Sequence, residues 1–203
     1  IAVSSRLVEY WRQSFGYNQN LHVIIPCTLS SDFKAPAFGD DEVAAARAAQ
    51  GFSADALVLI YSGSTAGWQS FGILGGILGN VLRNNAKAHL LFLAKEDESI
   101  TRMKKEFPSQ VTNKWVGHKE VQQVLMAGDY GILYRENSVT NQVASPTKFA
   151  EYLGAGLPVI ISENLGDYSD FVLTHQCGKV VSHDQTIQAD PCSAAEKRRM
   201  AKL

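Results

Sequence analysis

The stretch SPTKFAEYLGAGLPVIIS, residues 145–162, decides the fold because it holds a helix start, a helix end and a strand in close succession. Ser145 can cap a helix, and Pro146 suits the first helical position because the N–H that it lacks has no partner there. The glycines and the proline of residues 154–158 end this helix and prevent it from continuing. Residues 159–161, Val-Ile-Ile, then predict a strand that is buried on both faces. A helix that turns directly into such a strand is typical of a parallel α/β sheet.

Two charged residues stand in the helical part of this stretch, and they have two interpretations. Lys148, near the helix start, does not complement the helix dipole, whose N-terminal end is already positive. A lysine, free N–H groups and a dipole gathered in one place are suited to hold an anion such as phosphate. Alternatively, Lys148 and Glu151 form an exposed i,i+3 ion pair on a surface helix. The local chemistry leaves both interpretations open.

The rest of the chain alternates between apolar runs and amphipathic segments. Apolar runs predict strands at 57–61, 89–93, 111–116, 130–134, 159–161 and 178–181. Helical spacing predicts helices at 5–15, 42–50, 71–83, 96–107, 118–126, 164–175 and 196–202. Short strands at 1–4 and 22–26 are expected to flank the first helix. The alternation predicts an α/β fold, a doubly wound parallel sheet of Rossmann-like type with helices on both faces.

Length, charge and cysteine content narrow the class of protein. The 203 residues fit one or two domains and can bury a substantial core. A net charge of −1, without a long basic run, gives no indication of nucleic-acid binding. The three cysteines stand at no metal-ligand spacing, which favours reduced thiols in the cytoplasm. No apolar run is long enough to cross a membrane, and the start at Ile1 suggests a piece of a longer protein.

Polar loops after the predicted strands provide candidate ligand contacts, because open α/β sheets bind ligands at the carboxyl ends of their strands. Residues 63–65, Gly-Ser-Thr, follow a buried strand and either face a phosphate or form an ordinary turn; they are not a P-loop. Residues 135–144 are expected to form a polar loop after another strand. Its first residues, Arg135 and Glu136, are either ligand contacts or a solvated ion pair.

Residues 145–162 resemble the nucleotide-sugar signature of the retaining glycosyltransferases of the GT-B fold, the glycosyl transferases group 1 family. The segments LVLIYSGS at 57–64 and WVGHKEVQQVLMAGDYGILYR at 115–135 are similar to further segments of that family. The resemblance implies the C-terminal half of a GT-B enzyme, which binds a nucleotide diphosphate sugar.

The resemblance also implies roles for individual residues. Glu151 would bind the donor ribose, and amides at the start of its helix would bind the diphosphate. Residues after Gly117 would lie against the nucleotide base, where His118 either contacts the base or caps a surface helix. The family has a further glutamate near the transferred sugar, at the position that Val143 occupies here. The expected substrate-binding residues are Gly63, Ser64, Thr65, His118, Arg135, Ser145, Thr147, Lys148 and Glu151.

The domain organisation and the partners follow from the same resemblance. Residues 1–35 would be the end of an N-terminal domain and a linker, 36–183 the nucleotide-sugar-binding domain, and 184–203 a C-terminal tail helix. The donor would be a substrate, no cofactor or metal is expected, and the missing N-terminal domain would hold a saccharide or lipid-linked acceptor. The expected function is hexose transfer with retention, as in polysaccharide biosynthesis, and the fragment alone would be inactive. The expected location is the cytoplasm, with peripheral contact at the inner face of the membrane as an option.

Three other functions are compatible with an α/β sheet of this kind. A nucleotide-sugar epimerase would need several carboxylates and histidines facing the sugar, which residues 145–162 do not offer. A non-catalytic module that kept the fold is favoured by Val143 and by the lack of Arg and Lys directly after the strand at 57–61. A response-regulator-like switch would need a clustered acidic phosphorylation site, which the sequence lacks.

Overall fold

The computed structural model describes residues 1–31, 33–34, 36, 38–64, 71–182, 185 and 187–203. Within these ranges, six strands form one parallel sheet in the order β3-β2-β1-β4-β5-β6. The strands are β1 (Leu57–Ser62), β2 (Ala88–Leu93), β3 (Val111–Lys114), β4 (Tyr130–Leu133), β5 (Val159–Ser162) and β6 (Gly178–Val181). The strand order confirms the predicted doubly wound, Rossmann-like sheet, because the chain moves outward from β1 in one direction and then from β4 in the other.

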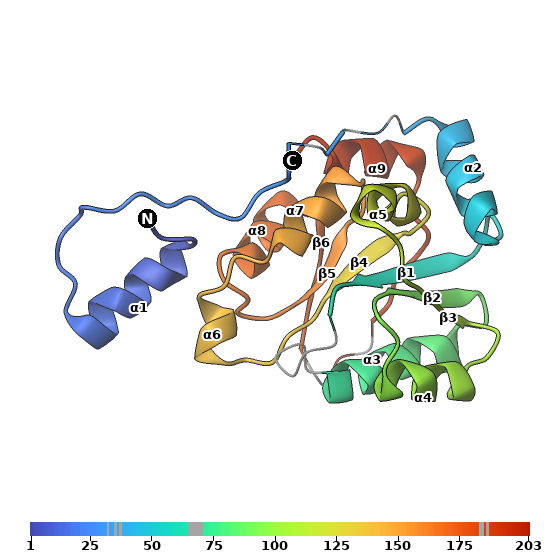
Figure 1. The fold of residues 1–203 in the computed structure, drawn as a ribbon, viewed down its shortest axis with the longest axis horizontal. Coiled ribbons are helices and arrows are strands. Elements are labelled where there is room, and N and C mark those ends of the chain that lie inside the picture. The colour runs from blue at the N-terminus through green and yellow to red at the C-terminus, as the bar shows by residue number, and fades with distance from the viewer. Residues whose placement is uncertain (32, 35, 37, 65–70, 183–184, 186) are drawn as a thin grey trace.

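Helices cover both faces of the sheet (Figure 1). The helices are α1 (Ser5–Phe15), α2 (Asp40–Gln50), α3 (Phe71–Asn84), α4 (Glu98–Glu106), α5 (His118–Leu125), α6 (Val139–Gln142), α7 (Thr147–Gly154), α8 (Tyr168–His175) and α9 (Ala194–Met200). Residues of α3 and α4 share one core cluster with Leu57 and Leu59, whereas residues of α5, α7 and α8 share the other with Val58 and Ile60. Strand β1 is thus buried on both faces by the alternation of its own side chains, which explains its continuous apolar sequence.

The prediction of two short strands at 1–4 and 22–26 is wrong. They form a single isolated parallel bridge between Ala2 and Ile24, beside helix α1. Figure 1 shows this N-terminal segment lying to one side of the sheet. Within the part of the chain that the structure describes, no further strand pairs with the bridge, and Leu21 remains 84% exposed. A strand pair without a sheet to extend has too few hydrogen bonds to become regular.

Helix α1 is nevertheless attached to the sheet domain at its first residues. The Ser4 hydroxyl caps the helix by accepting from the Leu7 N–H, and it donates to the carbonyl of Val143 at 2.7 Å. The carboxylate of Asp167 accepts from the N–H groups of Ser5 at 2.7 Å and Arg6 at 3.2 Å. The sheet domain therefore supplies part of the N-terminal cap of α1.

Two predictions about the decisive stretch and the loop before it need correction. The region 135–144 is not only loop, because Ser138 caps the four-residue helix α6 through the N–H of Asn141. Ser145 does not cap α7, whose N-cap is Pro146 without any side-chain hydrogen bond. The Ser145 hydroxyl is engaged elsewhere: it accepts from the Cys27 N–H at 2.8 Å and lies 2.9 Å from the Tyr168 hydroxyl.

A buried polar network ties α2 and α9 to the starts of β1 and β4. The Asp129 carboxylate is fully buried and accepts from Arg47 Nη1 at 3.1 Å, from the Val58 N–H at 2.7 Å and from the Cys192 N–H at 2.9 Å. Asp129 is therefore a structural residue directly before the start of β4. On α9, Lys197 is also fully buried; its Nζ donates to the carbonyl of Gly128, and burial lowers its pKa.

His89 on β2 should make the stability of the fold depend on pH. Its ring lies 5.6 Å from that of Phe52, and burial, followed by the charge of Arg47, lowers the pKa of His89 below its usual 6.5. The unfolded chain therefore takes up this proton more readily, so the stability contributed by neutral His89 is present above pH 6.5 and is lost as the pH falls. Urea titrations at pH 7.5 and pH 5 should show a smaller fall in unfolding free energy for His89→Gln than for the wild type. Equal falls would contradict this role.

Candidate functional site

The ends of β1 and β4 define the candidate site, because they are neighbours at the point where the strand order reverses. Ligands of open α/β sheets bind at the carboxyl ends of strands at this switch point. Gly63 and Ser64 directly follow β1, and Arg135 follows β4. The Tyr61 hydroxyl donates to the carbonyl of Ser64 at 2.5 Å, which holds the turn close to β1. Thr65, the third residue expected in this turn, lies outside the described residues.

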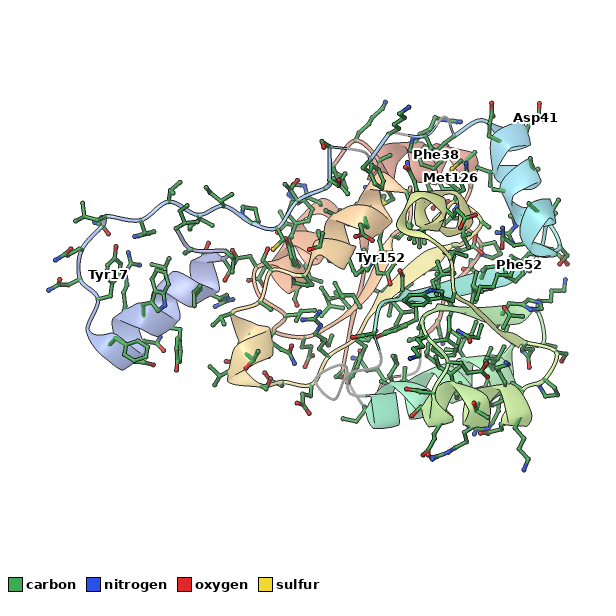
Figure 2. The ribbon with its side chains drawn as sticks, viewed as in Figure 1. Tyr17, Phe38, Asp41, Phe52, Met126 and Tyr152 are labelled. Atoms are coloured by element: carbon green, nitrogen blue, oxygen red, sulfur yellow. The ribbon has the colours of Figure 1, made fainter. Side chains whose placement is uncertain are left out.

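Tyr152 fixes α7 to this switch point. Its side chain is fully buried between helix and sheet, and its hydroxyl accepts from the Ser62 N–H at 2.8 Å and donates to the carbonyl of Ile132 at 3.1 Å (Figure 2). One side chain of α7 therefore joins the end of β1 to β4. Burial raises the pKa of Tyr152, so the hydroxyl stays neutral and keeps both hydrogen bonds.

Lys148 and Glu151 form the predicted i,i+3 ion pair, but the pair is not fully exposed. Lys148 Nζ lies 2.5 Å from Glu151 Oε2, and the two side chains are 29% and 15% exposed. The predicted contact between Lys148 and Glu151 is therefore confirmed, but the prediction that the pair is exposed is wrong. The lysine holds the carboxylate in one position before any ligand arrives.

A cavity of about 840 Å³ opens beside this ion pair. Thr147 and Glu151 of α7 line one wall and Val121, Gln122 and Leu125 of α5 line another. The third wall is the linker before α2, which contributes Thr28, Leu29, Ser30, Ser31, Phe33, Lys34 and Pro36. Gln122 Nε2 donates to the carbonyl of Lys34, so the linker is joined to α5 across the cavity.

Arg135 does not form the solvated ion pair with Glu136 that was one of the two interpretations of the sequence. Its side chain is half-buried, its Nε is buried without a hydrogen bond, and its Nη1 is 3.5 Å from Asn141 Oδ1. Among the described residues, no carboxylate lies within salt-bridge distance of its guanidinium. Burial lowers the pKa of Arg135. A cation without a carboxylate at a strand end can receive an anionic ligand.

The remaining expected residues divide between these features. Thr147, Lys148 and Glu151 are brought together at the start of α7, while Ser145 is 9% exposed with its hydroxyl already bonded. His118 is the first residue of α5, after the N-cap Gly117, but its side chain lies outside the description. The sequence did not reveal the linker wall or the hydroxyl of Tyr152. A tyrosine within the apolar stripe of α7 was the available signal, because a buried hydroxyl needs a partner.

The described residues include neither a cluster of metal-binding side chains nor a helix that could span a membrane. None of their His, Cys, Asp and Glu side chains gather in threes or more where a metal ion could be held. None of their helices is both long and apolar enough to cross a membrane.

Solved structures with this fold include several glycosyltransferases. WaaG, a glycosyltransferase involved in lipopolysaccharide biosynthesis, is 17% identical with a TM-score of 0.67, over 100% of this chain and 53% of WaaG. A glycosyltransferase from Rickettsia africae ESF-5 is 11% identical with a TM-score of 0.65, over 99% of this chain and 55% of its own. AviGT4, a glycosyltransferase involved in avilamycin A biosynthesis, is 15% identical with a TM-score of 0.55, over 100% of this chain and 54% of AviGT4. These similarities concern the fold, and the chain spans about half the length of these proteins.

The sequence itself carries a family assignment. No curated protein sequence matches the chain. The family described as "Glucosyltransferase 3-like, C-terminal domain" matches residues 81–201, which is more than half of the chain and includes α5, β4, α7 and β5. The chain therefore belongs to the glucosyltransferase 3-like family and contains its C-terminal domain.

Proposed function

We propose that this chain is the donor-binding half of a glycosyltransferase, which transfers a hexose from a nucleotide diphosphate sugar to an acceptor with retention at the anomeric carbon. The observation that carries the proposal is Glu151, whose carboxylate is held by Lys148 and lines the 840 Å³ cavity between α5, α7 and the linker. Family membership and the glycosyltransferases of like fold support the same reaction class.

Each part of the donor would meet a group of suitable chemistry. The Glu151 carboxylate would accept hydrogen bonds from the two ribose hydroxyls. The diphosphate would lie near Lys148 and the first N–H groups of α7, which have no partner within the helix. Arg135 would add a charged donor, and Gly63 and Ser64 would approach the phosphates from the end of β1. The base would then lie towards α5 and the linker, near His118.

The proposed chemistry is electrostatic. Negative charge develops on the departing diphosphate as the glycosidic bond breaks, and fixed positive groups that already point there lower the barrier. Lys148 and Arg135 would supply this stabilisation without a metal ion. The acceptor, a saccharide or lipid-linked saccharide, would be held mainly by a preceding domain, so this chain alone should bind donor without transferring sugar. Transfer by the isolated chain would contradict that part of the proposal.

Binding of nucleotide diphosphates tests the donor site. Calorimetric titration with UDP, GDP and ADP should show that the chain binds one of them better than the others. Glu151→Ala should weaken that binding by roughly tenfold or more, because a hydrogen bond to a charged group contributes about 1.5–3 kcal/mol. Glu98→Ala, an exposed acidic residue of α4, is the matched control and should bind like the wild type.

Two outcomes would contradict the donor site. If Glu151→Ala binds the nucleotide as tightly as the wild type, Glu151 does not contact the ribose. If the chain binds none of the three nucleotides, the donor site does not lie in this half of the protein. Donor binding without transfer in the full-length protein would instead favour a non-catalytic module.

A further inference from the structure

The linker that forms the third wall of the 840 Å³ cavity is tied to the sheet domain at Cys27, directly before its first cavity-lining residue, Thr28. The backbone N–H of Cys27 donates to the Ser145 hydroxyl at 2.8 Å. That hydroxyl lies 2.9 Å from the Tyr168 hydroxyl, which in turn donates to the carbonyl of Cys27 at 3.4 Å. Two side chains of the sheet domain thus satisfy both backbone polar groups of one residue.

These three contacts form a closed cycle of hydrogen bonds. Because the Tyr168 hydroxyl gives its proton to the Cys27 carbonyl, the Ser145 hydroxyl donates to Tyr168 while it accepts from the Cys27 N–H. Each of the three residues therefore donates once and accepts once, and hydrogen bonds connected in this way strengthen one another. Burial raises the pKa of Tyr168, so its hydroxyl keeps the proton that the cycle needs.

Packing against α7 fixes the position of this cycle. The ring of Tyr168 stacks on that of Phe149, with the ring centroids 4.1 Å apart and the planes 15° from parallel. Phe149 is buried in α7, the helix that also carries Glu151. Ser145 precedes the same helix, whose first residue, Thr147, lines the cavity. The cycle thus anchors the linker to the helix that carries the proposed ribose-binding carboxylate.

Beyond Cys27, the linker runs past α8 and α7 towards α2 (Figure 1). A β-carbon added at Gly154 would lie 2.8 Å from Phe33 Cε1 and 3.1 Å from Leu29 Cδ1, so both side chains rest against the end of α7. Residues 28–31, which line the cavity, belong to no helix or strand. Such a segment moves away at a low cost in free energy unless contacts like these hold it in place.

A cavity wall that moves lowers the affinity of the site, because ordering the wall uses part of the binding free energy. We propose that Ser145 and Tyr168 are positioning residues, whose hydroxyls hold the linker as a preformed wall and thereby raise the affinity of the cavity beside Glu151 for its ligand. Both hydroxyls act through the linker, and neither contacts the ligand. This role rests on the proposed function for the identity of that ligand, a nucleotide diphosphate.

Tyr168→Phe tests this role, because it removes the hydroxyl and keeps the ring that stacks on Phe149. In calorimetric titrations with UDP, GDP and ADP, the nucleotide that the wild type prefers should bind about fivefold more weakly, as expected for one lost hydrogen bond. In ¹H–¹⁵N spectra without nucleotide, the Cys27 amide should exchange with water about fivefold faster. Ser145→Ala should have both effects.

The matched control is Tyr10→Phe, which makes the same change on α1. Among the described residues, the Tyr10 hydroxyl has no hydrogen-bond partner. The control should therefore match the wild type both in nucleotide affinity and in exchange of the Cys27 amide. A purely structural role of Tyr168 would lower the urea midpoint of Tyr168→Phe and leave its nucleotide affinity unchanged, which would overturn the proposal.

The same measurements separate failure of this role from failure of the donor site. If Glu151→Ala weakens nucleotide binding while Tyr168→Phe and Ser145→Ala bind like the wild type, the donor site stands and the positioning role is overturned. Equal exchange of the Cys27 amide in the wild type and both variants would overturn the role as well, because the hydroxyls would then not hold the linker. If the wild type binds none of the nucleotides, the donor site fails, and the proposed effect on affinity fails with it.

Discussion

Asp129→Ala is expected to destabilise the domain by about 3–5 kcal/mol, the range measured when one partner of a buried ion pair is removed. The carboxylate is fully buried, and Arg47, 7% exposed, would keep its charge without a carboxylate to balance it. The N–H groups of Val58 and Cys192 would lose their acceptor as well. Urea denaturation followed by circular dichroism measures the loss as a lower midpoint.

The matched control for this prediction is Asp55→Ala. Asp55 also forms an ion pair, with Lys87 at 2.7 Å, but both side chains are mostly exposed. Exposed pairs contribute little, so the midpoint should stay within experimental error. If Asp129→Ala proves as mild as Asp55→Ala, the network does not hold α2 and α9 to the sheet in the way described.

Gly131→Ala is expected to cost about 3 kcal/mol, near the upper end for overpacking of a core. A β-carbon at this position of β4 would overlap the ring of Tyr152. The ring cannot move aside easily, because it is fully buried and its hydroxyl is bonded to both Ser62 and Ile132. The same urea titration measures the loss, and weaker nucleotide binding should accompany it because α7 would be displaced.

Two comparisons separate this clash from a general effect of replacing glycine. Gly76→Ala lies in helix α3, where nothing lies within 4 Å of an added β-carbon, and it should stabilise the protein by about 0.5–1 kcal/mol. In a Tyr152→Leu background, Gly131→Ala should cost at least 1 kcal/mol less than in the wild type, because the ring it meets is gone. An equal cost in both backgrounds would show that the ring is not the obstacle.

The sequence predicted those features whose causes are local. The strand at 57–61 is a continuous apolar run, and a run of this kind indicates a buried strand whichever other strands it pairs with. The Lys148–Glu151 contact was predictable because residues three apart are neighbours on any helix. Helix α6 was missed since four residues show no period, although the serine that caps it was visible.

The features that could not be predicted depend on partners far away in the chain. Ser145 was expected to cap its own helix, but its hydroxyl is used by Cys27 and Tyr168, which no local pattern reveals. Arg47 looks like one helix-favouring residue among alanines, yet its charge is required by Asp129, 82 residues later. The linker wall of the large cavity likewise depends on where a segment without a repeating pattern lies against α5.

The cap that Asp167 provides for α1 has a consequence for the order of assembly. Asp167 stands at the N-cap of α8 but makes no side-chain cap there, and its carboxylate serves a helix 162 residues earlier. During synthesis, α1 therefore leaves the ribosome with its Ser4 cap but long before the Asp167 part of the cap exists, and it cannot take its final place until Asp167 has followed. Contacts across so many residues are slow to close. The N-terminal helix is thus among the first parts of this chain to be made and among the last to be docked.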